Sequence, residues 1–437
     1  MIKALINVRL YDFESYIHEG YMLFDETILE VGSMKDFKNQ DYEIIDGKHD
    51  VIIPGLVNGH THIYSTFARG LSVHFNPKDF QGILDDLWWK IDRVLTKEMI
   101  YYSGIVHAVD SIKNGVTTLI DHHASGADII GTLKTLKEAV SDTVGLRGAY
   151  AFETSDRFDV EKCIDENISF LNQYKTPYCR GFFGLHASMS LSEETLKKVS
   201  EKLNKAPIHI HVAESILDQE DALKKYQERV VHRLNRHKLL NKNSIITHAI
   251  HVNDEELDLI KETGCVIAVN INSNMNNGVG IPDVSRFTDK KIPVIIGNDG
   301  ISSTVTTEYL SLLYGMHHLH QTPLRFNLDH LKHVVQTIYR YISELFEVKI
   351  GKFKPTYQAD FIRIPYQSPT PINQDNAFGH LFFGMFHSFK PKDVYIGGKL
   401  KVKDGKLESS VENLYQEAQE VALKHWNKVK EEESRCL

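Results

Sequence analysis

The sequence lacks the hallmarks of several protein classes. Its four cysteines lie far apart and form no CxxC pair, which disfavours a disulfide framework and a thiolate zinc site. No stretch approaches ~18 uncharged apolar residues, so we expect no transmembrane helix. The first residues carry charges where a signal peptide has an apolar run, and the spaced cysteines suit a reducing compartment, so we expect a cytoplasmic protein. There is no GxGxxG motif after a strand and no GxxxxGK(S/T) loop, which leaves nucleotide-cofactor folds without support.

Composition excludes some partners and draws attention to histidine. The 437 residues are 42% hydrophobic and 25% charged, an ordinary globular composition. Lys and Arg number 50 against 58 Asp and Glu, and the net charge of −8 disfavours nucleic acid and anionic membrane surfaces as main partners. Histidine is abundant, with 23 copies. Because histidine is the commonest metal ligand, the positions of these side chains guide the interpretation.

The pattern of apolar residues divides the chain into three parts. Residues 1–54 contain short strand patterns with turns between them, and strand patterns return between residues 352 and 409. Between residues 55 and 351, short apolar strands alternate with amphipathic helices, which is typical of parallel strands in an open sheet or a closed barrel. We therefore expect a small composite β domain from 1–54 plus 352–409, a barrel domain over 55–351, and a C-terminal helix over 410–437.

Individual elements follow from the same pattern. The expected strands of the middle part are Thr117–Ile120, Leu146–Ala151, Gly181–Leu185, Ile208–Val212, Ser244–Thr247, Val266–Val269 and Val294–Ile296. The expected helices are Met99–Lys113, Ile129–Val140, Val160–Gln173, Glu193–Leu203 and Ala222–Leu234. The stretch Phe353–Tyr366 is predicted to be rich in strand, and Trp88 and Trp89 are expected in the core or in an interface.

Two histidine pairs lie at predicted strands. His60 and His62 end an apolar run, and His209 and His211 lie within the strand Ile208–Val212. Residues i and i+2 of a strand project to the same face, so each pair can place two imidazoles beside one ion. Paired histidines also occur on ordinary surfaces, and the alternation alone does not choose between His209 and His211 as a ligand.

Three further polar groups lie where strands are expected to end. Glu214 lies three residues beyond His211, His248 follows an apolar strand, and Asp299 lies just beyond Val294–Ile296. A carboxylate that moves protons beside a metal ligand is what a metal-activated hydrolase needs. Each group also has a structural interpretation, with Glu214 and Asp299 as helix caps and His248 as a core residue. The order of the motifs favours the functional interpretation, because the carboxyl ends of barrel strands meet at one mouth.

Longer segments around these motifs match one family. PGLVNGHTHIYSTFARGL, HIHVAES, THAIHV and GNDGISS match the first, fifth, sixth and eighth strand motifs, and KFKPTYQADFIRIPY, GHLFFG and VYIGGKLKVKDGKL match toward the C-terminus. The chain thus resembles the amidohydrolase superfamily, in its branch of cytosine and guanine deaminases and chlorohydrolases. LWWKIDRVLTKEMIYYSG and TTLIDHHAS are similar to the SsnA-type aminohydrolases. The resemblance implies an α/β fold, a (β/α)8 TIM barrel with a small β-sandwich domain formed by the N- and C-terminal segments.

The resemblance also implies one divalent metal ion. Its ligands would be His60, His62, His211 and Asp299. Three imidazoles and a carboxylate suit Zn²⁺, with Fe²⁺ or Mn²⁺ as alternatives by ligand type. No lysine in the region of the fourth strand suggests a bridging carbamate, which favours one metal ion over two.

The same resemblance assigns catalytic roles to three residues. Asp299 would also take a proton from the attacking water, and His248 would orient that water. Glu214 would protonate a ring nitrogen and then the leaving nitrogen, a general acid/base role.

Candidates for substrate contact have weaker signals. His186, at the expected end of the fourth strand, matches a position where relatives contact substrate. Arg69, Glu153 and His123 lie just beyond or at predicted strand ends, although Arg69 and Glu153 could equally be exposed or paired charges. One of His122 and His123 should point away from the site, because neighbours on a strand alternate.

Together these features predict a metal-dependent hydrolase of carbon–nitrogen bonds outside peptides. The substrate would be a small heterocycle of the purine, pyrimidine or triazine type, and the reaction a deamination. Opening of a cyclic amide in a related ring is an alternative. A non-catalytic scaffold is a second alternative, disfavoured because all the proposed ligands are present. Barrels of this family commonly dimerise, so a homodimer is an expectation.

One segment departs from the family pattern. Relatives commonly have a proline in the loop after the seventh strand, whereas this chain reads NINSNMNNG over residues 270–278. The loop is rich in asparagine instead, so no substrate contact is transferred to it.

Overall fold

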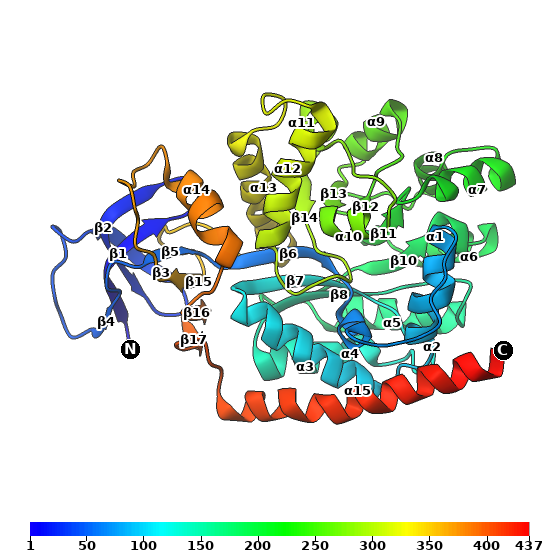
Figure 1. The fold of residues 1–437 in the computed structure, drawn as a ribbon, viewed down its shortest axis with the longest axis horizontal. Helices are drawn as coiled ribbons and strands as arrows, with labels where there is room; N and C mark the ends of the chain where they lie inside the picture. The colour runs from blue at the N-terminus through cyan, green and yellow to red at the C-terminus, as the bar shows by residue number, and fades with distance from the viewer. Residues whose placement is uncertain (437) are drawn as a thin grey trace.

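A mixed β sheet and an α/β barrel lie side by side in the computed structural model, which describes residues 1–436 (Figure 1). The sheet, at the left of Figure 1, combines the blue N-terminal strands with strands from near the C-terminus. The barrel occupies the middle and right of the view, and the red C-terminal helix runs beneath it. The predicted fold class is confirmed.

The barrel is built from two sheets of parallel strands. Within each sheet, every strand pairs with the next one along the chain, as expected for a strand–helix repeat. The four-stranded and five-stranded sheets contain, in order, β6 (Leu56–Thr61), β7 (Val116–His123), β8 (Arg147–Phe152), β9 (Cys179–Gly181), β10 (Phe183–Ala187), β11 (Ile208–Val212), β12 (Ile245–His248), β13 (Val266–Val269) and β14 (Val294–Ile296).

Backbone hydrogen bonds join these two sheets into a closed ring. On one side, His186 N donates to Thr154 O at 3.0 Å, which links β10 to the end of β8. On the other side, Asn298 N donates to His60 O at 3.0 Å, which links the segment after β14 to β6. The last strand therefore lies beside the first, and the strand ends surround one mouth.

The eight-stranded sheet outside the barrel combines strands from both ends of the chain. Its order is β17-β16-β15-β5-β1-β2-β3, with β4 also paired to β1. β15 pairs antiparallel with β5 and thereby connects the two ends of the chain. The strands are β1 (Lys3–Tyr11), β2 (Tyr16–Phe24), β3 (Ile28–Ser33), β4 (Glu43–Asp46), β5 (Val51–Pro54), β15 (Phe361–Ile364), β16 (Asp393–Ile396) and β17 (Lys399–Val402). The domain limits given above stay predictions.

Helices cover the outside of the barrel, and capping residues begin many of them. Asp159, Ser192 and Asn253 accept backbone hydrogen bonds at the starts of α5, α6 and α9. The α-helices are α1 (Phe80–Ile83), α2 (Trp89–Arg93), α3 (Lys97–Lys113), α4 (Thr132–Lys137), α5 (Val160–Gln173), α6 (Glu193–Lys202), α7 (Ile216–Tyr226), α8 (Val230–Arg236), α9 (Asp254–Glu262), α10 (Ile271–Asn276), α11 (Val284–Asp289), α12 (Thr306–His320), α13 (Leu328–Phe346), α14 (Ala377–Gly379) and α15 (Ser409–Cys436). Short π and 3-10 turns are η1 (Ile63–Ala68), η2 (Leu84–Trp88), η3 (Glu138–Val144), η4 (Ser188–Ser190), η5 (His380–Met385) and η6 (Phe386–Ser388). Within the described residues, no helix has both the length and the apolar character that crossing a membrane requires.

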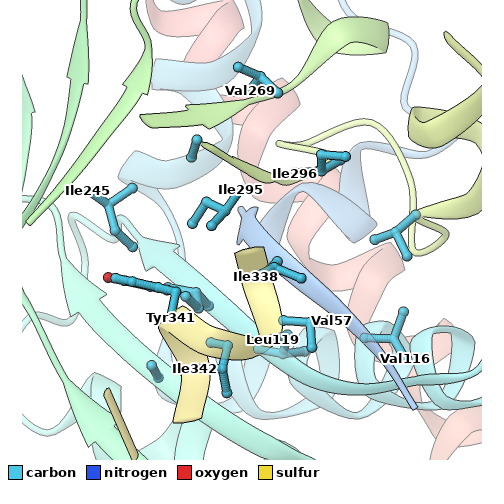
Figure 2. Packing of buried hydrophobic residues seen from close by; sticks show 14 of the residues in the cluster. Val57, Val116, Leu119, Ile245, Val269, Ile295, Ile296, Ile338, Tyr341 and Ile342 are labelled. Atoms are coloured by element: carbon cyan, nitrogen blue, oxygen red, sulfur yellow. The ribbon is translucent and has the colours of Figure 1, made fainter. Parts of the chain in front are cut away.

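One buried cluster joins the barrel strands to helix α13. Ile338, Tyr341 and Ile342 of α13 belong to the same hydrophobic cluster as Val57 of β6 and Leu119 of β7 (Figure 2). Each fully buried aliphatic or aromatic side chain contributes about 1.5–3 kcal/mol relative to exposure. This packing holds the strands whose far ends carry the candidate site.

Three predicted elements differ from the structure. The prediction of one continuous helix over Ala222–Leu234 is wrong, because Gln227 adopts a left-handed backbone conformation (φ 60°) that separates α7 from α8. The helix Ile129–Val140 begins later than predicted, after Gly131 at φ 83°, and continues into the π turn η3. Within Phe353–Tyr366 the strand is limited to β15.

A buried ion pair connects the barrel to the eight-stranded sheet. Arg147 of β8 and Asp360, next to β15, are both buried, and Arg147 Nη2 lies 2.8 Å from Asp360 Oδ2. Gly397 N donates to Asp360 Oδ1 at 2.6 Å. Asp360 therefore pairs with the charge of Arg147 in the barrel and accepts a backbone hydrogen bond from a turn of the sheet.

We expect Asp360→Ala to lower the free energy of unfolding by about 3–5 kcal/mol, because it leaves the Arg147 charge buried and unpaired. Denaturant titration measures this change. Glu194→Gln, which breaks the exposed Lys198–Glu194 pair, is the control and should cost less than about 1 kcal/mol. Equal effects of the two substitutions would contradict the role assigned to Asp360.

Candidate functional site

The ends of three barrel strands bring four polar side chains together. His60 and His62 lie at the end of β6, His211 lies on β11, and Asp299 follows β14. Asp299 Oδ1 is 3.3 Å from His60 Nε2 and 3.1 Å from His62 Nε2. His62 Nε2 is 3.1 Å from His211 Nε2. All four residues are buried, and one ligand atom of each lies within 4.8 Å of those of the others. The structure thus brings the four predicted ligands together, and we call this group of four residues the centre.

Backbone carbonyls orient two of these imidazoles. His62 Nδ1 donates to His122 O at 2.6 Å, and His211 Nδ1 donates to His186 O at 3.1 Å. A carbonyl can only accept, so each Nδ1 carries a proton, and in the neutral ring Nε2 presents a lone pair to the centre. Metal-ligating histidines are usually held in this way.

His60 has a histidine as its partner instead of a carbonyl. His60 Nδ1 lies 2.8 Å from His209 Nε2, and both rings are fully buried. When His60 Nδ1 donates to His209, His60 Nε2 also presents a lone pair to the centre. Among the described residues, His60 Nε2 makes no hydrogen bond of regular geometry, although it lies 3.3 Å from Asp299 Oδ1. This is the arrangement expected of a third imidazole ligand.

The buried carboxylate of Asp299 needs a positive charge beside it. Burial alone would raise the pKa of Asp299, but pairing with His60 and His62 holds that pKa well below its usual value. Asp299 in turn raises the pKa of His62 to about 9, against the opposing effect of burial. A carboxylate buried among imidazoles is stabilised by a proton or by a metal ion. Three imidazole nitrogens and a carboxylate oxygen are donors that suit zinc, so these residues fit a divalent metal ion.

Two predicted catalytic residues lie beside this centre. His248 Nε2 is 3.4 Å from Glu214 Oε2. Asn274 Nδ2 donates to His248 Nδ1 at 2.8 Å, so in the neutral ring the proton of His248 lies on Nε2, the atom nearest Glu214. Burial, with a contribution from Asp299, raises the pKa of Glu214 to about 8. Glu214 therefore holds a proton at neutral pH, as a general acid must.

The Asn-rich loop supports this arrangement. Ser273 Oγ donates to Asp299 Oδ2 at 2.5 Å, and Asn277 Nδ2 donates to Glu214 Oε1 at 3.3 Å. Sequence reasoning assigned nothing to these two residues or to Asn274. The signal that could have found them is the run of amide side chains just after a barrel strand.

A second group of side chains, which we call the inner wall, lies beside this centre in the same pocket. It consists of Asp92, Glu153, Arg157 and His186. Arg157 Nη2 is 2.8 Å from Asp92 Oδ2 and 2.9 Å from Glu153 Oε1. Burial raises the pKa of Glu153 to about 7, although Arg157 opposes this shift. Sequence reasoning found Glu153 and His186 but missed Arg157 and Asp92.

Two predicted substrate contacts lie outside the pocket. The exposed Arg69 guanidinium pairs with Asp110 at 3.0 Å. His123 Nε2 is 3.0 Å from Ser125 Oγ, away from the centre. His122, its neighbour on β7, is the residue that faces the inner wall, because side chains on a strand alternate. Arg69 and His123 therefore have no part in the function proposed below.

One pocket contains both the centre and the inner wall. It encloses about 790 Å³, open solvent at its mouth included. Trp88 and Trp89 line it, and Trp88 also packs against the hydrophobic core, as expected. They come from η2 and α2, and π turns are frequent at functional sites.

Comparison with known proteins identifies the class. A model of the amidohydrolase family matches residues 51–401, so the chain belongs to the amidohydrolase family. It is a hydrolase that acts on carbon–nitrogen bonds other than peptide bonds. The donor set and the family together support a divalent metal ion.

The chain is also similar to named deaminases in sequence and to solved deaminase structures in fold. The chain is 26% identical over 412 residues to 5'-deoxyadenosine deaminase of Methanocaldococcus jannaschii, covering 90% of this chain and 93% of that protein. It is 28% identical over 376 residues to 5-methylthioadenosine/S-adenosylhomocysteine deaminase of Syntrophomonas wolfei, covering 80% and 81%. An adenosine deaminase from Xanthomonas campestris with bound zinc has the same fold, with a TM-score of 0.84, 16% identity and 98% of each chain covered. The guanine deaminase of E. coli gives a TM-score of 0.75 at 18% identity, covering 92% and 99%.

We expect His209→Phe to weaken zinc binding about 10- to 100-fold, because it removes the acceptor that holds the proton on His60 Nδ1. Chelator competition measures the affinity. His209→Gln keeps an acceptor oxygen and should stay within about threefold of the native chain. Equal affinity of His209→Phe and the native chain would contradict this role.

Proposed function

We propose that the protein is a zinc-dependent deaminase of a heterocycle that carries an exocyclic amino group. The observation that carries the proposal is the juxtaposition of His60, His62, His211 and Asp299 with the carboxyl group of Glu214. A metal site alone is common to many reactions, whereas a buried acid beside it suits protonation of a ring nitrogen.

Four residues would hold the metal ion. His60, His62 and His211 would bind through Nε2 and Asp299 through a carboxylate oxygen, with Fe²⁺ and Mn²⁺ as alternatives to Zn²⁺. A bound zinc ion supplies Lewis acidity, which lowers the pKa of water from 15.7 to about 7.

The chain's own groups would move the protons. Glu214 would protonate a ring nitrogen of the substrate, take up the proton that Asp299 receives from the attacking water, and pass that proton to the departing amine. The proton of the added hydroxyl would return to Glu214 as the carbonyl forms. His248, with its proton on Nε2, would donate a hydrogen bond to the attacking water and orient it. Asp299 would accept the proton that this water loses, while Ser273 holds its other oxygen.

The substrate class follows from the relatives and from the pocket. Relatives are named deaminases of 5'-deoxyadenosine and 5-methylthioadenosine, and structural neighbours include adenosine and guanine deaminases and triazine hydrolases. We therefore infer an amino-substituted purine or a similar ring as substrate. Hydrolytic opening of a cyclic amide is the alternative. The homodimer and the cytoplasmic location stay predictions.

Ammonia release tests the proposal and depends on the metal. Purines, oxidised purines, pyrimidines, triazines and cyclic ureides are incubated with the zinc-loaded protein, and ammonia is compared with loss of ring absorbance. We expect at least one amino-substituted ring to release ammonia stoichiometrically. Dialysis against a chelator should abolish turnover, and about one equivalent of Zn²⁺ per chain should restore it. Ring loss without ammonia would favour the ring-opening alternative.

Glu214→Gln tests the acid/base assignment. The substitution keeps shape and hydrogen bonding but removes the proton donor, so turnover should fall about 10²- to 10⁴-fold while one metal ion per chain remains bound. Glu220→Gln, on the exposed side of the adjacent helix α7, is the matched control and should leave turnover unchanged. Near-native turnover in Glu214→Gln would refute the assignment.

A further inference from the structure

One stretch of chain supplies several residues of the pocket lining. This stretch, which we call the bridging segment, covers residues 70–93 between η1 and α3 and includes α1, η2 and α2. Its residues in the pocket lining are Phe80, Leu84, Trp88, Trp89 and Asp92. The Arg157 guanidinium lies 4.6 Å from the ring centre of Trp89 and pairs with Asp92. The position of the bridging segment therefore affects both the pocket lining and the inner wall.

The bridging segment has little hydrophobic core of its own. Among the described residues 70–90, Leu84 is the only one whose side chain is buried. Hydrogen bonds within the segment are local, such as that from Gly82 N to Asp79 Oδ1 at 2.9 Å. A segment with few buried apolar contacts opens at a low free energy. Contacts from the rest of the chain must therefore hold it in place.

The C-terminal helix α15 supplies such contacts at both ends of the segment. Trp426 Nε1 donates to Phe67 O at 2.6 Å, just before the segment begins. His425 is fully buried, and its Nε2 donates to Ile91 O at 3.0 Å, near the end of the segment. Figure 1 shows the red helix ending beside α2. The last turns of α15 thus hold the segment where it begins and where it ends.

Glu433 of α15 joins two further points of the segment. Its Oε1 accepts from His74 N at 2.9 Å and from Lys90 Nζ at 3.0 Å. The side chains of Lys90 and Glu433 are only 22% and 16% exposed, so water screens this ion pair less than it screens a surface pair. Because Lys90 is the neighbour of Trp89 in the chain, this carboxylate acts directly beside the pocket lining.

The first part of α15 is attached to the barrel instead. Glu412 Oε1 lies 2.7 Å from Lys113 Nζ of α3 and accepts from Leu407 N at 3.3 Å. Farther along α15, Lys424 Nζ donates to Glu98 Oε1 of α3 at 3.1 Å. These contacts fix α15 against a barrel helix, so its last turns have a defined position against the bridging segment.

We propose that His425, Trp426 and Glu433 are positioning residues of the pocket. They hold the bridging segment so that Trp89 and Asp92 keep their places in the pocket lining, and they thereby set the affinity for substrate. The residues assigned to proton transfer lie after barrel strands and not on this segment, so their placement does not depend on α15. The kinetic consequence of the inference rests on the deaminase function proposed above, whereas its structural consequence does not.

Glu433→Ala tests the proposal on the zinc-loaded chain. We expect KM to rise at least about threefold while kcat stays within about twofold of the native value, because substrate binding is weakened and the chemical step is not. A general loss of folded protein would lower kcat and leave KM unchanged. An unchanged KM would overturn the proposal.

Glu412→Ala is the matched control for Glu433→Ala. Glu412 also accepts from one backbone N–H and one lysine, but at the end of α15 that is remote from the pocket. Both kinetic constants should stay within about twofold of the native values. An equal rise of KM in the two variants would overturn the assignment to the last turns of α15.

Two variants of His425 test the hydrogen bond to Ile91 O. His425→Gln keeps an N–H donor, whereas His425→Phe removes it and keeps a ring of similar size. We expect KM to rise more in His425→Phe than in His425→Gln, by at least about threefold. Equal KM values in the two variants would overturn the role of this hydrogen bond.

Amide hydrogen exchange, followed by mass spectrometry without substrate, tests the structural consequence independently of activity. In Glu433→Ala, amides of residues 72–90 should exchange at least about fivefold faster than in the native chain and in Glu412→Ala, with the barrel strands unchanged. This result would support the proposal even if no tested ring released ammonia. Unchanged exchange in the segment, or an equal increase throughout the chain, would overturn it.

Discussion

The approach of the Asp299 carboxylate to the imidazoles of His60 and His62 depends on how the barrel closes. Asn298 N donates to His60 O at the closing seam, and this backbone pairing sets Asp299 beside the first strand. Carbonyls of the neighbouring strands then hold the rings of His62 and His211. The hydrogen-bonding register of the sheet therefore places the ligand atoms, and the hydrophobic cluster beneath keeps that register.

Charge organises the rest of the pocket around this centre. Asp299 stays ionised because imidazoles surround it, whereas burial keeps a proton on Glu214 at neutral pH. Two carboxylates in one pocket thus have different protonation states, which is how a site supplies an acid and a base together. Beside the centre, Arg157 pairs with both Asp92 and Glu153.

The sequence predicted the barrel well because its strands are short apolar runs bounded by polar residues. Ile208–Val212, Val266–Val269 and Val294–Ile296 have the predicted limits, since periodicity is a local property. The helix Ala222–Leu234 failed because no glycine marks the left-handed turn at Gln227. The motifs at strand ends found the four residues proposed to hold the metal ion, and the fold brings these residues together. Contacts between distant segments, such as that of Arg157 with Asp92, leave no local pattern, and sequence reasoning could not anticipate them.

Anomalous diffraction at the zinc edge, from crystals grown with zinc, tests the central claim most directly. The account predicts one peak per chain, with the Nε2 atoms of the three proposed histidines and a carboxylate oxygen of Asp299 at about 2.0–2.2 Å. A peak bound instead by the neighbouring group of His122, Glu153 and His211, or no peak within the barrel mouth, would contradict it.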